Sequence, residues 1–533
     1  GVYYTLLVIS VVSLVDYMCF GRNLGTLSSS LTFAEDPSFS HKEVFLNTAC
    51  AVACSVFLFL AYKQKRIKKN IPFAYMILIF CTCVLSAINI YHIQQKLSDM
   101  AYIKDTKEYD GQALFSLSRK GKNVIVLMLD RAISGYVPYL FEEKPELREQ
   151  FTGFSYYPNA LSYGFYTSLA SPALYGGYDY TVTEMDRRSE EKLVDKHNEA
   201  LKVMPLMFLN EGFSVTVCDP TYANYHLIPD LSIYDEYEGI HACITMGSIK
   251  DPALQQYMRA SGLRNNERNF FCYAVFKVMP LCFSRAVYDG GKYFTSKQSD
   301  IDEDFAQSYS VLSQLPELTA ISDDDRDTFL MMSNDITHEP CLLQLPAYEP
   351  VETVNNEGYE SPVEKYIHLD TKLQISHYHV NMAAFLQLGK WFAFMKENGV
   401  YDNTRIILVS DHGRGLGQFD YMLMAEPPID VQWCNPLLMM KDFYAETFST
   451  IDDFMTNADV PSLAVKDIIA NPLNPFTGNP IIDEKRKMQP QIISLSHNFG
   501  IERNNGYTFD TSDGHWYSVH DDIFREENWK QLD

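Results

Sequence analysis

The feature that most constrains the fold is a set of short, uninterrupted apolar runs that each end in a polar residue. Each run holds five to seven residues without alternation of polar and apolar side chains, which is typical of parallel strands covered on both faces. We expect strands at Asn123–Leu129, Phe213–Cys218, Thr328–Met332 and Arg405–Ser410. Helical segments separate the strands, and Val380–Glu397 is the clearest of them. This alternation predicts an α/β fold with a doubly wound, mostly parallel sheet and helices on both faces.

The polar residues at the strand ends indicate where a site should form. Asp130, Asp219, Asp335 and the pair Asp411-His412 each come at or just after the end of a run. In open parallel sheets, ligands bind beyond the carboxyl ends of the strands. A strand has to end in something polar, which accounts for one or two of these residues. Asp411-His412 directly after a strand offers an oxygen and a nitrogen ligand, the pair expected at a divalent-metal site.

The first ninety residues hold three apolar runs of the length that crosses a bilayer, about 20 residues. They are Val2–Phe20, Val44–Tyr62 and Ile71–Tyr91. A secretory signal peptide would have one shorter run and a cleavage site, so residues 1–94 are predicted to form three transmembrane helices. The basic cluster Lys63–Asn70 is of the kind retained in the cytoplasm, so the third helix leads outward. The chain begins with Gly1 inside an apolar run, and we expect it to be a fragment that lacks upstream membrane helices.

Charge supports a division between a membrane region and an outer domain. Residues 1–95 hold seven Lys and Arg against four Asp and Glu, a net charge of +3. The whole chain has a net charge of −24, so the residues after 95 carry −24 − 3 = −27. We predict a juxtamembrane linker at residues 95–120 and an extracytoplasmic catalytic domain at 121–533. The localisation predicted is a multi-pass protein of the plasma membrane. An outer domain this acidic excludes nucleic acid as a partner.

A longer motif surrounds the Asp411-His412 pair. Tyr401–Gly413 carries the sequence YDNTRIILVSDHG. It resembles the YDNT-x-I-I-x-x-SDHG signature of sulfatase-like enzymes in the alkaline phosphatase superfamily. The resemblance extends from Lys122 to Leu463, and it implies that the strand before Asp130 is the first metal-ligand strand of that family.

The nucleophile decides the chemistry within this superfamily. Sulfatases carry Cys or Ser in a C/S-x-P-x-R motif, whereas the equivalent residues 157–177 contain neither Cys nor Arg. The segment is similar to the Thr-containing segment of lipoteichoic acid synthases and other membrane-bound phosphoglycerol or phosphoethanolamine transferases. These enzymes also share the layout of membrane helices followed by an outer domain. The resemblance implies that Thr167 is the nucleophile, with Ser168 as the alternative.

The same resemblance implies a metal-dependent reaction. One divalent ion would be held by Asp130, Thr167, Asp411 and His412, and this oxygen-rich set favours Mn²⁺, with Mg²⁺ and Zn²⁺ as alternatives. The ion would activate the threonine hydroxyl and neutralise charge on a phosphodiester. A phospho-threonine intermediate would form as the donor's alcohol leaves. An acceptor hydroxyl would then take the phosphoryl group.

Further substrate contacts follow from the loop after Thr328–Met332. Two-metal relatives place an Asp and a His four residues apart here, and this chain has Asn334 and His338. Asn at that position favours a single metal. We therefore expect His338 to contact the phosphate or to act as general acid, and Asn334 to bind substrate.

One departure from the family leaves the transferred group open. Lipoteichoic acid synthases have His-Gly-Asn and Phe-Trp-Asn-Arg segments that help bind glycerol phosphate, and the corresponding residues 217–226 contain no Trp or Arg. Tyr222, Asn224 and His226 either line a substitute pocket or form an ordinary surface loop. His226 is the residue of this group that we predict to bind substrate.

The leading functional prediction is a transferase that moves phosphoglycerol from a phospholipid, phosphatidylglycerol, to a cell-envelope glycan or polymer. A phosphoethanolamine transferase or a phosphodiesterase of the same superfamily is the alternative enzymatic reading. An alternative of another class is a non-catalytic envelope protein that keeps the fold for assembly. The presence of Asp130, Thr167, Asp411 and His412 together argues against that class.

Overall fold

The chain folds as two units. A computed structural model describes residues 2–21, 31, 33, 37–100, 111–252, 254, 268–294, 301–498, 500–501 and 503–532. Gly1–Asp105 and Gln255–Ser299 form the first unit, and Thr106–Leu254 and Asp300–Asp533 form the second.

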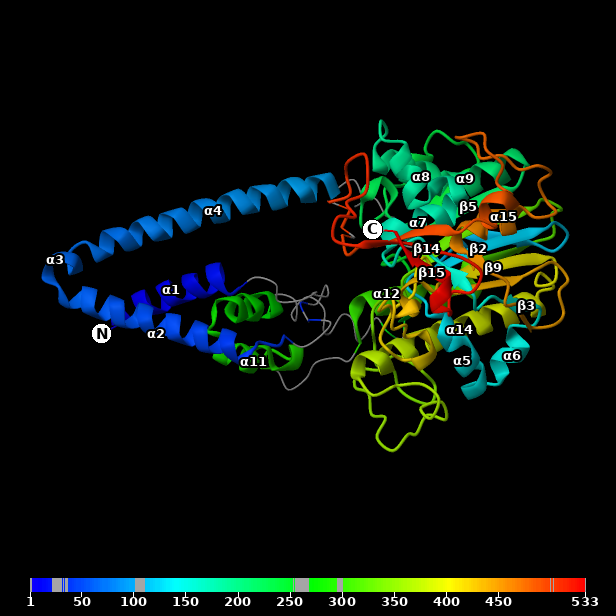
Figure 1. The fold of residues 1–533 in the computed structure, drawn as a ribbon. Helices are drawn as coiled ribbons and strands as arrows, with labels where there is room; N and C mark the ends of the chain where they lie inside the picture. Colours follow the sequence, from blue (N-terminus) through cyan, green and yellow to red (C-terminus); the bar gives the residue numbers. More distant parts are fainter. Residues whose placement is uncertain are drawn as a thin grey trace. The chain divides into compact units, whose positions relative to one another are not determined.

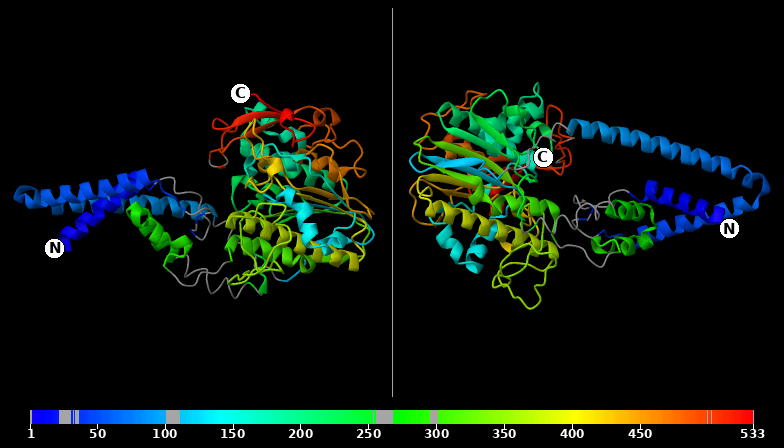
Figure 2. Two further views of the ribbon diagram at one scale, coloured as in Figure 1. Left: turned by 60° about the horizontal axis from the view of Figure 1, so that its bottom comes forward. Right: turned by 180° about the vertical axis from the view of Figure 1, so that it is seen from behind.

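The second unit is built on an eight-stranded sheet with the order β11-β3-β10-β9-β2-β8-β5-β6 (Figures 1 and 2). Its five neighbouring strands from β9 to β6 are all parallel. β10 runs antiparallel to both β9 and β3. The strands span Asn123–Leu129 (β2), Phe154–Tyr156 (β3), Ser214–Cys218 (β5), Ile240–Cys243 (β6), Thr328–Asn334 (β8), Thr404–Val409 (β9), Leu438–Lys441 (β10) and Ser449–Thr450 (β11). The mostly parallel sheet predicted from the sequence is confirmed.

Helices cover both faces of this sheet, as Figure 1 shows. α7, α9 and α15 pack together over one face, and α12, α14 and α6 lie over the other. The helices of this unit span Val137–Glu143 (α5), Glu146–Gln150 (α6), Thr167–Gly176 (α7), Val182–Arg187 (α8), Leu193–Asn210 (α9), Glu303–Ser313 (α12), Leu315–Leu318 (α13), Lys372–Glu397 (α14), Val460–Val465 (α15) and Glu484–Lys487 (α16). Coverage on both faces explains why the side chains of β2, β8 and β9 are all buried.

Three small sheets complete the second unit. β13, β14 and β15 form an antiparallel sheet near the carboxyl terminus, and two parallel pairs join β1 to β7 and β12 to β4. These strands span Phe115–Ser118 (β1), Ala160–Leu161 (β4), Thr319–Ser322 (β7), Met455–Thr456 (β12), Gln491–Leu495 (β13), His515–Val519 (β14) and Trp529–Gln531 (β15).

The predicted strands and helix differ from the observed ones mainly at their boundaries. The four predicted strands correspond to β2, β5, β8 and β9. α14 begins at Lys372, eight residues before the predicted start at Val380, because Thr371 and Gln374 form a capping box there. It ends at the predicted Asn398-Gly399, where Gly399 adopts a φ of 70°.

The first unit contains the apolar helices of the amino-terminal region. Its helices span Val2–Cys19 (α1), His41–Lys63 (α2), Lys65–Lys68 (α3), Ile71–Met100 (α4) and Leu281–Tyr288 (α11). Within the described residues, two helices are long and apolar enough to cross a membrane: α2, and α4 from Ile71 to Gln95. They suggest a membrane anchor. The first predicted run forms the shorter apolar helix Tyr4–Cys19, so the third crossing and a multi-pass topology stay predictions.

The division into units departs from the predicted domains at two places. Residues 95–100 of the predicted linker continue α4, and Phe115–Ser118 forms β1 of the second unit. Residues 255–299, predicted to belong to the outer domain, are grouped with the amino-terminal helices. Their aromatic side chains pack with Phe33, which the linear sequence does not indicate.

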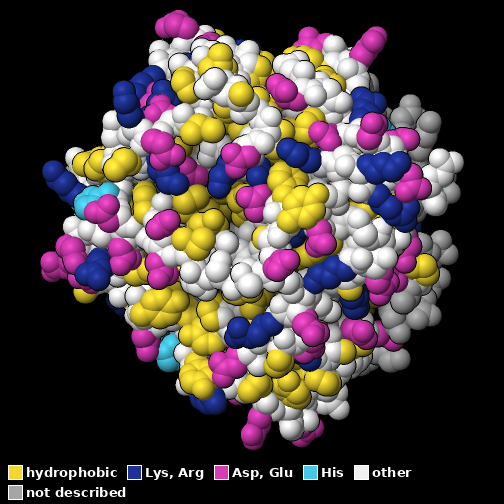
Figure 3. Space-filling model, turned by 90° about the vertical axis from the view of Figure 1, so that its right-hand side faces the viewer, with side chains coloured by type: hydrophobic (Ala, Val, Ile, Leu, Met, Phe, Trp, Pro, Cys, Tyr) yellow, Lys and Arg dark blue, Asp and Glu magenta, His cyan; other side chains and the backbone are white. Residues whose placement is uncertain are grey.

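The surface of the second unit carries mixed charge. On the face shown in Figure 3, acidic and basic side chains are interspersed with apolar ones, and no continuous basic area gathers there. The expectation that nucleic acid is not a partner rests on net charge and stays a prediction.

Arg405, at the amino end of β9, provides a test of the packing of the second unit. Its side chain is 1% exposed, and it donates hydrogen bonds to Asp442 Oδ1 at 2.7 Å and to the Leu463 carbonyl oxygen at 3.2 Å. We expect Arg405→Met to lower the free energy of unfolding by about 1–3 kcal/mol, because it leaves buried carbonyl oxygens without a donor. Asp442, whose side chain is 38% exposed, can bind water instead. Denaturant unfolding of the full chain in detergent measures the change.

A matched control is Arg119→Met. Arg119 pairs with Asp323 at 3.0 Å, but both side chains are exposed, by 41% and 74%. This substitution should cost less than about 1 kcal/mol. Equal losses in the two variants would contradict a structural role for the buried Arg405.

Candidate metal centre and active site

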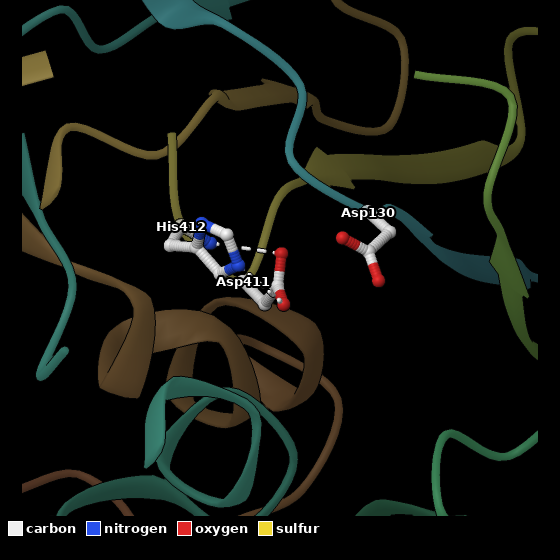
Figure 4. Close-up of side chains that lie close together, drawn as sticks. All are labelled: Asp130, Asp411 and His412. Carbon is white, nitrogen blue, oxygen red and sulfur yellow. Dashed lines mark hydrogen bonds and ion pairs between the residues drawn. The ribbon is translucent and has the colours of Figure 1, made fainter. Parts of the chain in front are cut away.

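Neighbouring strands bring three predicted ligands together. β2 lies between β8 and β9 in the sheet, Asp130 follows β2, and Asp411 and His412 follow β9. Because the two strands are parallel, their carboxyl ends lie at the same edge. One ligand atom from each of the three residues lies within 4.8 Å of the others, and all three residues are buried (Figure 4). The predicted convergence of these side chains is therefore present in the structure.

Hydrogen bonds orient the three side chains and leave one atom of each without a partner. Asp411 Oδ1 accepts from the backbone N–H groups of Arg131 at 3.1 Å and His412 at 2.9 Å. His412 Nδ1 lies 2.7 Å from the Gly413 carbonyl oxygen, which can only accept, so Nδ1 carries the proton. Asp130 Oδ1, Asp411 Oδ2 and His412 Nε2 are buried without a hydrogen-bond partner. Buried polar atoms of this kind require an explanation.

The pKa shifts of Asp130 and His412 indicate that the site lacks a positive charge. Burial, and then the Asp411 carboxylate, raise the pKa of Asp130 to about 8. Burial lowers the pKa of His412 to about 4. Without a positive charge at their centre, the buried carboxylate is hard to ionise. A cation would offset this cost, since it favours ionised carboxylates.

These residues fit a divalent metal ion. Two carboxylates supply oxygen atoms, and neutral His412 presents the lone pair of Nε2, held in that tautomer by the Gly413 carbonyl. Such a mixed oxygen and nitrogen set suits Mn²⁺, Mg²⁺ or Zn²⁺. The geometry supports a metal centre but does not select one of these ions.

Thr167 lies beside this group of ligands. It is the first residue of α7, its hydroxyl donates to Asp130 Oδ2 at 3.4 Å, and it is 7% exposed. The amino terminus of a helix favours anions, because its backbone N–H groups and the helix dipole are oriented towards them. A hydroxyl at this position can act as a nucleophile towards a bound phosphate. Ser168, the alternative nucleophile, is only 1% exposed.

The loop after β8 brings His338 to the same region. Thr337 donates to the Asp130 carbonyl oxygen at 2.6 Å, and Arg131 donates to the His338 carbonyl oxygen at 3.3 Å. His338 Nδ1 pairs with Glu339 Oε1 at 2.8 Å. Burial and the Arg131 guanidinium lower the pKa of His338, but Asp130 and Glu339 together raise it above its usual value. A raised pKa favours the protonated form of His338, the form that a general acid needs.

Asn334 does not fit the predicted substrate-binding role. It is fully buried, its side-chain amide donates to the Ser308 carbonyl oxygen at 3.0 Å, and its oxygen accepts from the Ile336 N–H at 3.1 Å. Both polar atoms hold the turn after β8. The sequence identifies Asn334 as a departure from the Asp of two-metal relatives, but only the fold shows that its amide has a structural role.

The role predicted for His226 stays a prediction. Its side chain is exposed. It lies near the Asp230 carboxylate, whose pKa it helps to lower. Tyr222, from the same loop, is closer to the ligands. Burial raises the pKa of Tyr222 most, and the carboxylates of Asp130, Asp335 and Asp411 raise it further.

Two arginines near the ligands were missed by the sequence analysis. Arg131 has a φ of 61°, an unusual conformation for a residue that is not glycine, and its guanidinium lowers the pKa of Tyr222 and His338. Arg414 stacks over Trp433 at 4.6 Å. The sequence does contain a signal for both arginines. Arg131 directly follows Asp130, and Arg414 directly follows the Asp-His-Gly motif.

Comparisons with known proteins identify similar folds. No family model matches the chain, and no curated protein matches it. The lipoteichoic acid synthase LtaP from Listeria monocytogenes is 12% identical over 82% of this chain and 90% of its own, with a TM-score of 0.42. A protein in the alkaline phosphatase superfamily from Vibrio parahaemolyticus is 13% identical over 78% of this chain and 82% of its own, with a TM-score of 0.39.

A membrane protein is also among the similar structures. The lipooligosaccharide phosphoethanolamine transferase EptA from Neisseria meningitidis is 10% identical over 80% of this chain and 70% of its own, with a TM-score of 0.30. The three names include the superfamily and both kinds of transferase that the sequence motifs resemble. TM-scores of this size carry no inference about activity, so the function proposed below depends on the geometry of the site.

The raised pKa of Asp130 predicts how stability depends on pH in the metal-free protein. Folded Asp130 keeps its proton up to about pH 8, whereas the unfolded chain loses it near 3.8. The folded state therefore binds more protons, and stability falls as pH rises towards 8. His412 has the opposite effect only below 6.5, because burial lowers its folded pKa to about 4. Above that pH, we expect a loss of up to about 1.4 kcal/mol per pH unit.

Buried Asp219 adds a slope of the same sign up to about pH 7, because burial raises its folded pKa to about 7. Thermal denaturation of the chelated full-length chain between about pH 7 and pH 8 therefore tests the contribution of Asp130. Asp130→Asn should lose most of the slope, because position 130 no longer ionises. His338→Gln is the control: the raised pKa of His338 adds a slope of the same sign, but the larger share from Asp130 should remain. An unchanged slope in Asp130→Asn would show that other groups cause it.

Proposed function

We propose that this chain is a membrane-anchored, metal-dependent transferase that moves phosphoglycerol from phosphatidylglycerol to a cell-envelope glycan or polymer. The observation that carries the proposal is the Thr167 hydroxyl, which lies 3.4 Å from Asp130 Oδ2 at the amino terminus of α7. It lies beside three buried ligand atoms that have no hydrogen-bond partner. This combination supports phosphoryl-group transfer through a covalent intermediate.

The residues around Thr167 suit an anionic substrate. Arg131 and His338 both lie close enough to shift the pKa of Asp130, and α7 directs its positive end towards the same point. A divalent ion held by Asp130, Asp411 and His412 would activate the hydroxyl and offset the charge that develops on the phosphoryl oxygens. A phosphodiester group is the substrate that matches these positive charges.

The first half of the reaction transfers the phosphoryl group to Thr167. Its oxygen forms a bond to phosphorus, its proton passes to Asp130 Oδ2, and the bond from phosphorus to the diacylglycerol oxygen breaks. His338 donates a proton to the leaving oxygen. The products of this half are diacylglycerol and phosphoglycerol esterified to Thr167.

The second half returns the enzyme to its starting state. The acceptor hydroxyl attacks phosphorus and gives its proton to His338. The bond between phosphorus and the Thr167 oxygen breaks, and Thr167 recovers its proton from Asp130. If water is the acceptor, the same steps make the protein a phosphodiesterase.

The two apolar helices suggest why the donor would be a lipid. An anchored domain remains near the membrane surface, where phospholipid head groups are concentrated. Plasma-membrane localisation, with the second unit outside the cytoplasm, belongs to this proposal. The basic cluster Lys63–Asn70, predicted to be cytoplasmic, supports that orientation.

Intact mass measurement tests the covalent step. We expect full-length protein in detergent, incubated with Mn²⁺ and phosphatidylglycerol but without an acceptor, to gain the mass of one phosphoglycerol unit. Thr167→Ala should gain none, because the attacking oxygen is absent. Ser168→Ala is the matched control and should still form the adduct. An adduct that survives in Thr167→Ala but not in Ser168→Ala would identify the other hydroxyl as the nucleophile.

Exchanging the donor lipid tests the transferred group. Phosphatidylethanolamine in place of phosphatidylglycerol should give no adduct. An adduct formed from phosphatidylethanolamine alone would identify a phosphoethanolamine transferase. If neither lipid reacts with metal-loaded protein, the non-catalytic class becomes the better explanation.

The role of His338 can be tested through the leaving group. His338→Gln should slow adduct formation from phosphatidylglycerol by about 10²–10⁴-fold, because the diacylglycerol oxygen needs a proton. A nitrophenyl ester of phosphoglycerol has a leaving group that needs none, so its reaction should be much less affected. Equal slowing with both donors would show that His338 contacts the phosphate instead of acting as general acid.

A further inference from the structure

The segment 268–294 forms a helical hairpin that belongs with the amino-terminal helices. In the sequence it lies between β6 and α12 of the second unit, but it is grouped with the first unit. Residues 268–278 are helical, and α11 follows at Leu281–Tyr288. Figures 1 and 2 show both green helices beside α1 and α2. We call residues 268–294 the inserted hairpin.

One face of the inserted hairpin is buried against the first unit. Phe276, Val287, Tyr288 and Tyr293 form a buried cluster with Phe33. The Phe33 backbone N–H donates to the Tyr288 hydroxyl at 2.8 Å. This contact is specific packing between the hairpin and Phe33, which lies between α1 and α2 in the sequence.

Buried hydrogen bonds connect the hairpin directly to the apolar helices. The Leu281 N–H donates to Asn47 Oδ1 at 2.9 Å, and Asn47 Nδ2 donates to Asp16 Oδ1 at 2.6 Å. Lys277 lies over the Tyr17 ring at 5.3 Å. Asn47 therefore joins α1, α2 and α11 at one point.

Other large apolar side chains of the hairpin, outside the buried cluster, are exposed. Phe270, Phe271, Phe283 and Phe294 are 63%, 71%, 55% and 65% exposed. Single exposed apolar residues are ordinary, but a group of them on one short element marks an interaction surface. Aromatic side chains on an amphipathic helix are typical of elements that lie in a membrane interface.

The charge of the inserted hairpin differs from that of the chain around it. It contains four basic residues, Arg268, Lys277, Arg285 and Lys292, and one acidic residue, Asp289, a net charge of +3. The whole chain has a net charge of −24. Basic side chains beside exposed aromatic ones favour anionic lipid head groups.

The contact lies at one end of the apolar helices. Asp16 is near the carboxyl end of α1 (Val2–Cys19), and Asn47 is near the amino end of α2 (His41–Lys63). The basic cluster Lys63–Asn70 is at the other end of α2. If that cluster is cytoplasmic, the inserted hairpin lies at the outer surface of the membrane, the side on which the second unit is proposed to act.

We propose that the inserted hairpin lies in the outer interface of the bilayer, with its exposed phenylalanines among the acyl chains and its basic side chains near the lipid phosphates. The inference rests on the membrane anchor in the proposed function. It adds a second lipid attachment, located within the sequence of the catalytic unit. The chain would then be attached to the membrane at two places in its sequence: at the amino-terminal helices and at the hairpin that interrupts the sequence of the catalytic unit.

Photo-crosslinking tests the proposal in the full chain. p-Benzoylphenylalanine replaces Phe271 or Phe283, and the protein is reconstituted in vesicles of phosphatidylglycerol and phosphatidylethanolamine. Tyr444, an aromatic residue of the second unit that is 72% exposed, is the matched control. Phe80 of α4, 68% exposed, is the positive control for the anchor. We expect lipid adducts at positions 80, 271 and 283, several times more abundant than at 444.

The controls separate failure of the hairpin from failure of the anchor. Lipid adducts at 80 but not at 271 or 283 would overturn the inference and leave the anchor in place. Adducts between two protein chains at 271 and 283 would also overturn it, since the exposed face would then bind a second copy. Absence of lipid adducts at 80 would overturn the anchor, and the inference with it, without affecting the intact-mass test of Thr167.

Discussion

The central constraint in this structure is the burial of two carboxylates and an imidazole at one edge of the parallel sheet. β2 lies next to β9, so Asp130, Asp411 and His412 are brought together away from water. Removing ionised carboxylates from water is costly unless positive charge balances them. The ligand atoms lack hydrogen-bond partners. Asp411 Oδ2 lies 3.6 Å from His412 Nε2, but this contact supplies positive charge only if His412 is protonated. The arrangement suits a divalent cation.

Other parts of the second unit are positioned around this point. α7 begins at Thr167 and places a hydroxyl beside Asp130. The loop after β8 adds His338, and Arg131 connects that loop to the Asp411 carboxylate through its backbone and side chain. These elements bring a hydroxyl, an imidazole and positive charge to one place. In the proposed function, that combination would serve the transfer of a charged phosphoryl group.

Much of the fold could be predicted because local patterns determine it. Strands buried on both faces need continuous apolar runs, and β2, β5, β8 and β9 were found on that basis. The antiparallel β10 was not predicted, and α14 was predicted eight residues too short. The grouping of residues 268–294 with the amino-terminal helices was missed, because it depends on contacts with Phe33 and Asn47 far away in the sequence.

The sequence by itself determined the fold class, the apolar helices and the identity of Asp130, Asp411 and His412 as a candidate ligand group. Short-range spacing and a specific motif carry that information. Tertiary structure alone decided which other groups reach the ligands: Arg131 and Tyr222 lie near them, whereas Asn334 holds a turn. The physical reason is that hydrogen-bond partners and electric fields depend on distances between segments. Those distances exist only once the sheet has brought the segments together.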